Sequence, residues 1–508
     1  MKQKVYIMDT TLRDGEQTSG VSFTDTEKLT LAKMLLEELN VNRIEIASAR
    51  VSDGEFQAVR KITEWAASKD LLDKVEILGF VDGKISIDWI KNAGGEVINL
   101  LCKGSYRHVT EQLRRSPEEH VADIRNSIAY AAKNGLRVNI YLEDWSNGMR
   151  NSKDYVFYLL DQLKDEKIDR FMLPDTLGIL GPDETFDYCK EMLARYPELH
   201  FDFHAHNDYD LAIANVYKAL KAGIDCVHTT VNGLGERAGN APLSSVIGLI
   251  MDHLHLETTV DESRLTKISR LVETFSGIRI PENKPLIGEN VFTQCSGVHA
   301  DGDNKNKLYY NDLVPERFGR KRQYALGKTS GKANIKKNLE EIGINLDADA
   351  LRRVTEKIIE LGDHKETVTT DDLPYIVSDI LKSEAIGQRI RFTNYIISHA
   401  KNLHPSATVS LEIDNEKYEA NSPGDGQYDA FMNALKKIYF RLNKPFPQLV
   451  NYTVTIPPGG RTDALVETVI TWKLNREFKT RGLETDQTSA AITATEKMLN
   501  VIENDFTV

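Results

Sequence analysis

Two histidines separated by one residue offer the clearest chemistry in this chain. They are His204 and His206, in residues 201–208, which read FDFHAHND. If this stretch is a β-strand, side chains at i and i+2 project from the same face, so both imidazoles point the same way. Imidazole is a good ligand for divalent Zn, Mn, Fe or Co. The alternative is a pair of structural histidines at a strand end, so a metal site needs ligands from elsewhere in the chain.

Other polar side chains also follow apolar, β-rich runs. They are Arg13 and Asp14 after 4–9, Glu143 and Asp144 after 137–142, Thr176 after 170–174, and the stretch 231–240 (VNGLGERAGN) after 225–230. Each group lies where a strand is expected to end. The arrangement of those strands therefore decides whether the groups meet.

Strand-like and helical segments alternate through roughly the first 250 residues, the size and order of a (β/α)8 barrel, or TIM barrel. The predicted strands are 4–9, 43–47, 75–81, 97–102, 137–142, 170–174, 201–208 and 225–230. Most are continuous apolar runs, as expected of parallel strands buried on both faces. A doubly wound open sheet is the alternative, but no GxGxxG opens the first βα unit. Only a closed barrel brings the ends of the first and seventh strands together.

In such a barrel, Asp14 joins His204 and His206, and we expect one further oxygen ligand, for which Asn240 is the candidate. This mixed nitrogen and oxygen set suits Mg, Mn, Zn or Co. Two open positions on an octahedral ion would accept the ketone and carboxylate oxygens of a 2-oxo acid, and the ion would polarise the ketone. Arg13 would stabilise the developing alkoxide. Alternatively, Arg13 forms a salt bridge with a carboxylate at the barrel mouth, for which Glu16 and Glu143 are the candidates.

Bulk properties limit the function and the cellular setting. The chain has 508 residues, 41% hydrophobic, with a net charge of −12, so we expect roughly two to four domains and no nucleic-acid partner. No signal peptide and no run of ~20 apolar residues is evident, which predicts a protein outside the membrane. The four cysteines are scattered, which is typical of a reducing compartment, and we expect the cytoplasm.

Three motifs resemble those of the isopropylmalate, homocitrate and citramalate synthase family. They are 9–17 (DTTLRDGEQ), 204–208 (HAHND) and 232–240 (NGLGERAGN), and the resemblance extends over nearly the whole chain. Members of that family join acetyl-CoA to a 2-oxo acid and hydrolyse the thioester. The resemblance implies an acyltransferase that uses a divalent metal (Mn, Mg, Zn or Co) and forms a homodimer.

The resemblance also assigns roles to single residues. It makes Asp14, His204, His206 and Asn240 the metal ligands, and it places Arg13 and Thr176 on the 2-oxo acid. It places Glu143 near the reacting carbons, and His299 and Tyr309 over the barrel mouth, where a homodimer would present them to the partner's barrel. Without the resemblance, His299 on a glycine-flanked loop would only be a plausible proton handler.

The identity of the 2-oxo acid depends on apolar residues near the strand ends. Tyr141, Leu78 and Leu101 would leave a pocket large enough for a methyl group, which favours pyruvate and an (R)-citramalate product, at the start of a route to isoleucine. The alternatives are ordinary core packing at these positions and 2-isopropylmalate synthesis from 2-oxoisovalerate. A carbon–carbon lyase acting on 3-hydroxy-3-methylglutaryl-CoA is a more distant alternative. Such lyases carry a cysteine in the loop after strand eight, and 233–240 has none. A non-catalytic amino-acid sensor is a third possibility.

The remaining chain divides into two further parts. We expect the barrel domain to span 1–276, helical linker subdomains 277–388, and a regulatory domain 389–508, an α+β pseudo-repeat of strands followed by a helix, twice. A basic cluster in the linker (317, 320–322 and 328) is either a solvated face or a contact for CoA phosphates. The resemblance implies an end-product amino acid in the last domain, with isoleucine expected and leucine the alternative. The candidate pocket residues, which could instead be domain core, are Tyr428, Leu449, Tyr452, Ile456, Val466 and Gln487.

Overall fold

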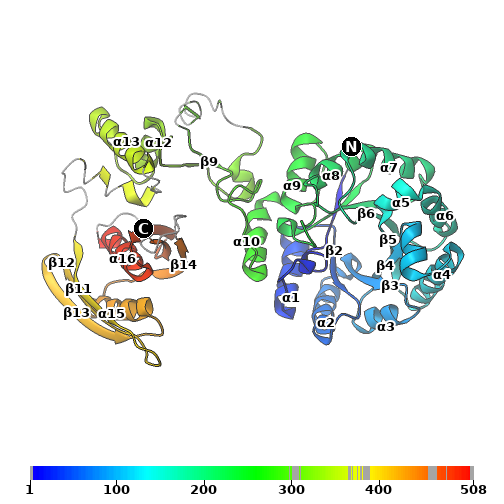
Figure 1. Cartoon of the computed structure of the whole chain (residues 1–508), viewed down its shortest axis with the longest axis horizontal. Helices are drawn as coiled ribbons and strands as arrows, with labels where there is room; N and C mark the ends of the chain where they lie inside the picture. The colour runs from blue at the N-terminus through cyan, green and yellow to red at the C-terminus, as the bar shows by residue number, and fades with distance from the viewer. Residues whose placement is uncertain are drawn as a thin grey trace. The chain divides into compact units, whose positions relative to one another are not determined.

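The computed structural model folds into two compact units (Figure 1). Unit 1 comprises Met1–Phe292 and Asn311–Lys321, and unit 2 comprises Thr293–Tyr310 and Arg322–Val508. The structure describes residues 4–296, 298–299, 302, 308, 311–363, 368, 370–373, 376–377, 380, 389–455, 466–475 and 477–503.

Unit 1 is built around a closed barrel of parallel strands in the order β1 to β8, which confirms the predicted (β/α)8 fold. The strands are β1 (Tyr6–Asp9), β2 (Arg43–Ser48), β3 (Val75–Phe80), β4 (Val97–Lys103), β5 (Arg137–Glu143), β6 (Arg170–Asp175), β7 (Phe201–Ala205) and β8 (Cys226–Thr229). Direct pairing of β1 with β8 closes the barrel, with Met8 opposite His228 and Asp9 opposite Thr229. The ends of the first and last strands are therefore neighbours.

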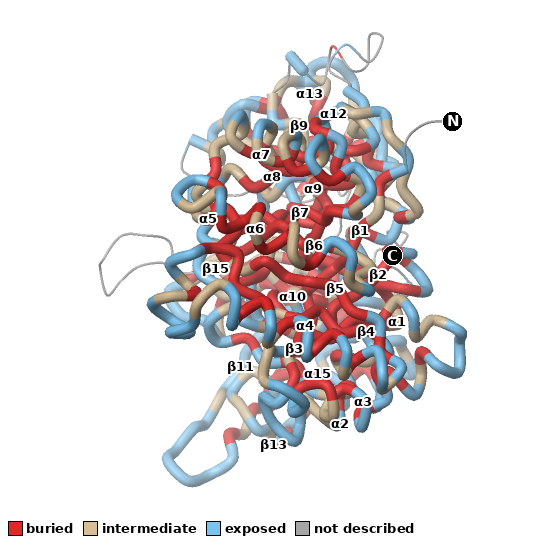
Figure 2. The backbone as a smooth tube through the Cα atoms, turned by 90° about the vertical axis from the view of Figure 1, so that its right-hand side faces the viewer, coloured by how far each residue is buried: buried red, intermediate tan, exposed pale blue. Residues whose placement is uncertain are grey.

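Helices surround the strands (Figure 1), and most residues of the barrel strands are buried, drawn red in Figure 2. The helices of unit 1 are α1 (Asp25–Lys33), α2 (Asp53–Ser68), α3 (Ile85–Asn92), α4 (Pro117–Lys133), α5 (Trp145–Asn151), α6 (Lys153–Leu163), α7 (Pro182–Arg195), α8 (Ala212–Ala222), α9 (Leu243–Gly248) and α10 (Leu265–Ser276). Residues 24–27 (TDTE) predict a capping box before α1, and it is present, since Thr24 accepts from the Glu27 N–H and Glu27 accepts from the Thr24 N–H.

The short helix α5 was not expected between β5 and α6. Two glycines permit it, because a Cβ on Gly148 would lie 2.1 Å from the Gly104 carbonyl oxygen. This close approach of two backbones leaves no room for a side chain. It fixes the loops that follow β4 and β5 against each other.

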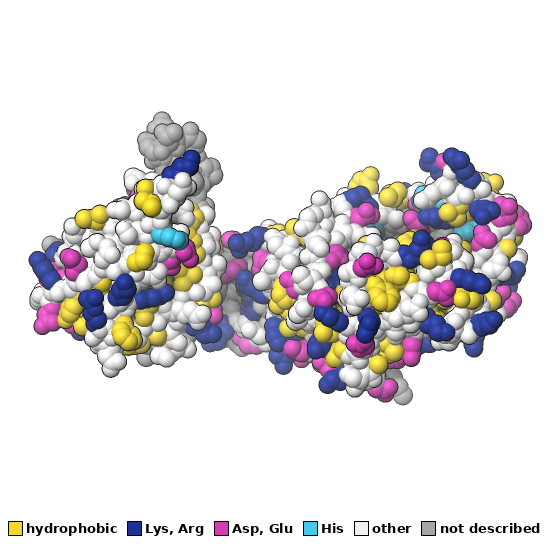
Figure 3. Space-filling view, turned by 90° about the horizontal axis from the view of Figure 1, so that it is seen from below, with side chains coloured by type: hydrophobic (Ala, Val, Ile, Leu, Met, Phe, Trp, Pro, Cys, Tyr) yellow, Lys and Arg dark blue, Asp and Glu magenta, His cyan; other side chains and the backbone are white. Residues whose placement is uncertain are grey.

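The barrel interior contains charged side chains as well as apolar ones. Arg43 forms ion pairs with Glu76 and Asp202, and all three are buried. Paired in this way, the charges avoid the large cost of an isolated buried ion. Charged side chains on the surface are mixed in sign, and Lys, Arg, Asp and Glu intermingle over the face seen in Figure 3. Among the described residues, no helix is both long and apolar enough to cross a bilayer.

Unit 2 begins with short elements and then repeats one motif. The first elements are β9 (Thr293–Gln294), β10 (Gln323–Tyr324), α12 (Lys332–Glu341) and α13 (Ala348–Asp363). The repeat consists of β11 (Ile390–Ser398), β12 (Ser406–Ile413), β13 (Glu416–Pro423) and α15 (Gln427–Arg441), then β14 (Gln448–Thr455), β15 (Val466–Lys473), β16 (Glu477–Glu484) and α16 (Gln487–Glu503). The predicted α+β pseudo-repeat is confirmed. The sequence also predicts a helix at 370–382, where the structure describes 370–373, 376–377 and 380, with a 3-10 helix at Thr370–Asp372.

One prediction in this domain was wrong. The β-rich composition of 408–418 predicts a single strand, but the stretch contains the end of β12, a tight turn and the start of β13. Asp414 and Asn415 form the turn with φ of 48° and 70°. Asp and Asn tolerate this left-handed conformation, and two such residues match the twist of an antiparallel hairpin.

Candidate functional site

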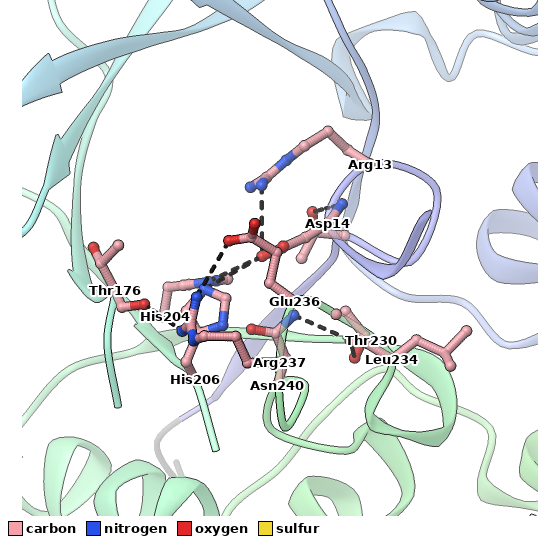
Figure 4. Close-up of polar contacts among 12 residues, drawn as sticks. Arg13, Asp14, Thr176, His204, His206, Thr230, Leu234, Glu236, Arg237 and Asn240 are labelled. Atoms are coloured by element: carbon pink, nitrogen blue, oxygen red, sulfur yellow. Dashed lines mark hydrogen bonds and ion pairs between the residues drawn. The ribbon is translucent and has the colours of Figure 1, made fainter. Parts of the chain in front are cut away.

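The carboxyl ends of β1 and β7 bring three potential metal ligands together (Figure 4). The His204 Nε2 atom lies 3.2 Å from Asp14 Oδ2, and the His206 Nε2 atom lies 3.8 Å from the same oxygen. One ligand atom from each side chain lies within 4.8 Å of the others, and all three residues are buried. Both imidazoles therefore lie beside the same carboxylate, although the strand predicted at 201–208 ends at Ala205 and His206 follows it in an isolated bridge with Asn240.

The electrostatics of this cluster favour the protonation states that bind a cation. Burial acts to raise the pKa of Asp14, but Arg13, His204 and His206 together hold that pKa well below its usual range. Burial lowers the pKa of His204, and burial together with the neighbouring His204 lowers the pKa of His206 to about 4. An ionised carboxylate and neutral imidazoles are the forms that act as ligands.

Asn240 lies beside the cluster through an antiparallel bridge with His206. Its Nδ2 donates to the Leu234 carbonyl at 3.1 Å, whereas its Oδ1 is buried without a hydrogen-bond partner among the described residues. Asp14 Oδ1 is in the same state. Buried polar atoms without partners are costly and need an explanation. Two such oxygens beside two neutral imidazoles fit a divalent cation.

Arg13 is held against the cluster by a carboxylate that was not predicted. Its Nε donates to Glu45 Oε2 at 2.6 Å, and its Nη1 lies 3.5 Å from Asp14 Oδ2. Glu45 is on β2, is fully buried, and also accepts hydrogen bonds from Thr10 and Asn99. The alternative that Arg13 forms a salt bridge with a carboxylate is therefore confirmed, but the suggested partners, Glu16 and Glu143, were wrong. Those carboxylates pair instead with the buried Lys28 and Lys103.

Tyr141, Leu78 and Leu101 come together in a small apolar cluster inside the barrel, with Met8, Met172 and Cys226. The Tyr141 ring centroid lies 5.7 Å from that of His204, and the Arg13 guanidinium carbon lies 5.8 Å from the Tyr141 centroid. The Tyr141 hydroxyl is buried, which raises its pKa well above the usual value. An apolar wall therefore borders the candidate metal ligands.

The ends of β5 and β6 supply the remaining predicted residues of the barrel mouth. Glu143 lines an open cleft of about 910 Å³ together with Asp144 and Leu177. The Thr176 hydroxyl accepts a hydrogen bond from the Asp144 N–H at 2.9 Å. Arg237, which was not predicted, donates to the Thr176 carbonyl at 2.8 Å and pairs with Asp208.

Sequence reasoning missed Glu45 and Lys103, although a signal was present. Glu45 interrupts the apolar run RIEIA at 43–47, and Lys103 ends the run 97–103. A charged residue inside a strand buried on both faces must point into the barrel and find a partner there. The partner cannot be read from the strand itself.

Two predicted residues belong to unit 2. His299 is exposed, and Tyr309 lies outside the described residues. Their expected place over a barrel mouth stays a prediction. In the basic cluster, Arg317 pairs with Asp252 and Glu262, and Arg320 donates to the carbonyls of residues 288 and 289. The guanidinium groups of Arg317 and Arg320 therefore bind other parts of unit 1 and do not form a solvated face.

The regulatory candidates are partly brought together. Tyr428 and Tyr452 have ring centroids 5.6 Å apart, and the Tyr428 hydroxyl lies 2.7 Å from Thr495 Oγ1. Leu449 is on β14, Val466 begins β15 and Gln487 begins α16. Ile456 lies outside the described residues.

Family comparisons agree with the motifs. The HMGL-like model matches residues 4–272, more than half of the chain, the homocitrate synthase post-HMGL domain-like model matches 286–366, and the LeuA allosteric (dimerisation) domain matches 367–503. A provisionally named (R)-citramalate synthase of Methanopyrus kandleri is 35% identical over 91% of this chain and 89% of its own length. The chain belongs to the isopropylmalate, homocitrate and citramalate synthase family. It is therefore an acyltransferase of the acetyl-CoA-condensing type, with a C-terminal allosteric domain.

Two relatives from one organism are named for different 2-oxo acid condensations. The (R)-citramalate synthase of Methanocaldococcus jannaschii is 31% identical and covers 98% of this chain and all of its own length. The 2-isopropylmalate synthase of the same organism is 34% identical and covers 98% of this chain and 95% of its own length. Overall identity therefore does not separate the two activities within the family. The residues around the 2-oxo acid must do so.

Proposed function

We propose that the protein condenses acetyl-CoA with pyruvate and water to give (R)-citramalate and CoA. The observation that carries this proposal is the apolar cluster of Leu78, Leu101 and Tyr141 beside His204. A tyrosine and two leucines leave room for a methyl group at the ketone, whereas a branched 2-oxo acid needs more space. Relatives that span nearly the whole chain and are named as synthases favour condensation over a lyase reaction.

Asp14, His204, His206 and Asn240 are the residues that would hold the divalent metal, for which Mn, Mg, Zn and Co are the candidates. When bound, the cation supplies Lewis-acid polarisation of the 2-oxo acid. Arg13, fixed by Glu45, presents positive charge where the ketone oxygen becomes an alkoxide. The Thr176 hydroxyl binds the substrate carboxylate. The apolar wall excludes water from the methyl side of the ketone.

The chemistry requires one proton abstraction, one new carbon–carbon bond and one thioester hydrolysis. A proton leaves the acetyl methyl group, that carbon attacks the pyruvate ketone carbon, and the ketone oxygen takes up a proton. Water then cleaves the thioester and releases CoA. We propose Glu143, His299 and Tyr309 as the groups that act around the acetyl carbons, with the latter two delivered across a homodimer.

A panel of 2-oxo acids tests the proposal. Release of free CoA would be measured with a thiol reagent for pyruvate, 2-oxobutyrate and 2-oxoisovalerate, and the product identified by mass spectrometry. We expect the highest kcat/KM with pyruvate and a product with the mass of citramalate. A preference for 2-oxoisovalerate would establish 2-isopropylmalate synthesis instead, the second candidate, which the relative at 34% identity supports.

We further propose that the C-terminal domain binds isoleucine and lowers the activity, with leucine as the alternative effector. The matched allosteric (dimerisation) domain and the aromatic pair Tyr428 and Tyr452 support this regulatory role. Isoleucine is the end product expected of a route that begins with citramalate. Inhibition of CoA release by each amino acid, measured side by side, distinguishes the two.

A further inference from the structure

A buried lysine meets the candidate catalytic carboxylate at the barrel mouth. Lys103 is the last residue of β4 and Glu143 the last residue of β5, and the two are paired across the parallel ladder. Lys103 Nζ forms an ion pair with Glu143 Oε2. The side chain of Lys103 is only 10% exposed, against 25% for Glu143. Lysine is rarely buried to this extent unless it is paired.

The backbone of Lys103 is anchored from three sides. Its N–H donates to His120 Nε2 on α4 at 3.2 Å, and its carbonyl accepts from the Tyr155 hydroxyl on α6 at 3.1 Å. The next N–H, of Gly104, donates to the Glu143 carbonyl at 2.6 Å. The backbone of Lys103 is therefore fixed in position, which limits the positions that its ammonium group can reach.

The neighbouring carboxylate, Asp144, is occupied by hydrogen bonds within the barrel mouth. Asp144 accepts hydrogen bonds from the Ser105 hydroxyl at 2.7 Å and from Asn147 Nδ2 at 2.8 Å, so it ties together the loops after β4 and β5. Both carboxylates line the cleft, but the side chain of Glu143 is 25% exposed against 3% for Asp144, and its ion-pair partner among the described residues is Lys103. Of the two acidic residues at the end of β5, Glu143 is the one free to face a substrate.

We propose that Lys103 is a positioning residue for Glu143 in the condensation. Its ammonium group fixes the direction of the Glu143 carboxylate towards the acetyl carbons and supplies the counter-charge that keeps this carboxylate at a mouth shared with Asp14 and Glu45. This inference rests on the proposed function, in which Glu143 acts near the reacting carbons. Lys103 itself touches neither substrate in this scheme. Its effect on catalysis must therefore pass through Glu143.

Kinetics of four proteins test the inference: wild type, Lys103→Met, Glu143→Gln and the double variant. Methionine keeps an unbranched side chain that is one atom shorter and removes the charge. We expect Lys103→Met to lower kcat for CoA release about 100-fold, the size typical of a disturbed acid–base group. The KM for pyruvate should stay within about threefold, because the Arg13 and Thr176 side of the site is untouched. In the Glu143→Gln background, the same change should cost less than about threefold, since residues acting as a unit are not additive.

Controls separate this inference from the proposed function and from misfolding. Lys153→Met removes a lysine from the more exposed pair with Glu191 and should leave kcat unchanged. If Lys103→Met has a lower unfolding midpoint than wild type, Lys103→Gln replaces it in the cycle. A wild-type protein that releases no CoA with any 2-oxo acid overturns the proposed function. An active wild type overturns the present inference if Lys103→Met keeps kcat within about threefold, or if the two losses multiply in the double variant.

Discussion

At the scale of single residues, the candidate metal centre combines burial with unsatisfied oxygen atoms. His204 and His206 are held in their neutral form, while Asp14 is held ionised. Neither state needs a proton to be removed when a cation enters. The arrangement is therefore a preformed site rather than a cluster of surface groups.

Replacing His206 by alanine should abolish divalent-metal binding and lower the rate of CoA release by at least about 1000-fold, because a ligand is lost from a site with few alternatives. Calorimetric titration of the chelator-treated protein with Mn, Zn, Co or Mg measures the binding. His200→Ala is the matched control, since His200 is exposed and lies immediately before β7. Near-normal turnover of His206→Ala with added metal would refute the ligand assignment.

Substrate selection is also a property of single residues. Leu101→Ala should raise kcat/KM for 2-oxobutyrate relative to pyruvate by about tenfold, because one methylene in an apolar pocket is worth roughly 1–3 kcal/mol. Leu100→Ala is the control. Leu100 is the adjacent residue on β4 and packs into the outer core rather than the inner cluster. An equal change of the ratio in both variants would show that the effect comes from loosening β4.

At the scale of elements, the loop after β8 contains a glycine whose backbone conformation and close contacts leave no room for a side chain. Gly235 has φ of 152°, and a Cβ there would lie 2.3 Å from Asn240 Nδ2. Gly235→Ala should therefore displace Asn240 and weaken metal binding by at least tenfold. Gly83→Ala also adds a Cβ at a positive φ of 78°, but with nothing within 4 Å. It should cost only about 1–2 kcal/mol of stability and leave metal binding unchanged. Equal metal affinity in both variants would contradict the role given to Gly235.

Helix α4 stabilises the end of β4 through a histidine that must stay neutral. Burial lowers the pKa of His120 to about 4, and its Nε2 accepts the Lys103 N–H. In the unfolded chain His120 takes up a proton near pH 6.5, whereas in the folded chain it does so only near pH 4. The contribution of neutral His120 to the free energy of unfolding is therefore complete above pH 6.5 and is lost as the pH falls to 4.

Urea unfolding from pH 7.5 to 4.5 measures this contribution. The free energy of unfolding of the wild type should fall more steeply than that of His120→Gln, by up to about 3 kcal/mol over the range. His253→Gln, at an exposed position, should follow the wild-type curve. Parallel curves for wild type and His120→Gln would show that His120 does not titrate as described.

At the scale of the whole molecule, the candidate metal ligands lie in unit 1, whereas the matched allosteric (dimerisation) domain lies in unit 2. Tyr428→Ala should raise the isoleucine concentration needed for half-inhibition at least tenfold, because it removes one ring of the pair with Tyr452. The kcat and KM measured without isoleucine should not change. Lys436→Ala, on the exposed face of the same helix α15, should inhibit like wild type. A Tyr428→Ala protein with unaltered inhibition would place the effector elsewhere.

The sequence by itself determined the barrel, its strand order and the positions of Asp14, His204 and His206. Those features follow from local patterns: apolar runs for the strands, period-two spacing for the histidines, and chain order for a closed ring of parallel strands. The repeat of the C-terminal domain is local in the same sense. Its error at 408–418 overlooked a signal that is present in the sequence, because Asp414 and Asn415 are residue types that favour a hairpin turn.

Only the tertiary structure decided which charges meet. Glu45 holds Arg13, Lys103 holds Glu143, and Asn240 turns a buried oxygen towards the histidines. Each partner comes from a different strand or loop, at a distance set by the closure of the barrel and by glycines that allow backbones to touch. A strand pattern states that a charged side chain points inward, but the identity of its partner depends on the register between strands. That register is a property of the folded barrel rather than of any one segment.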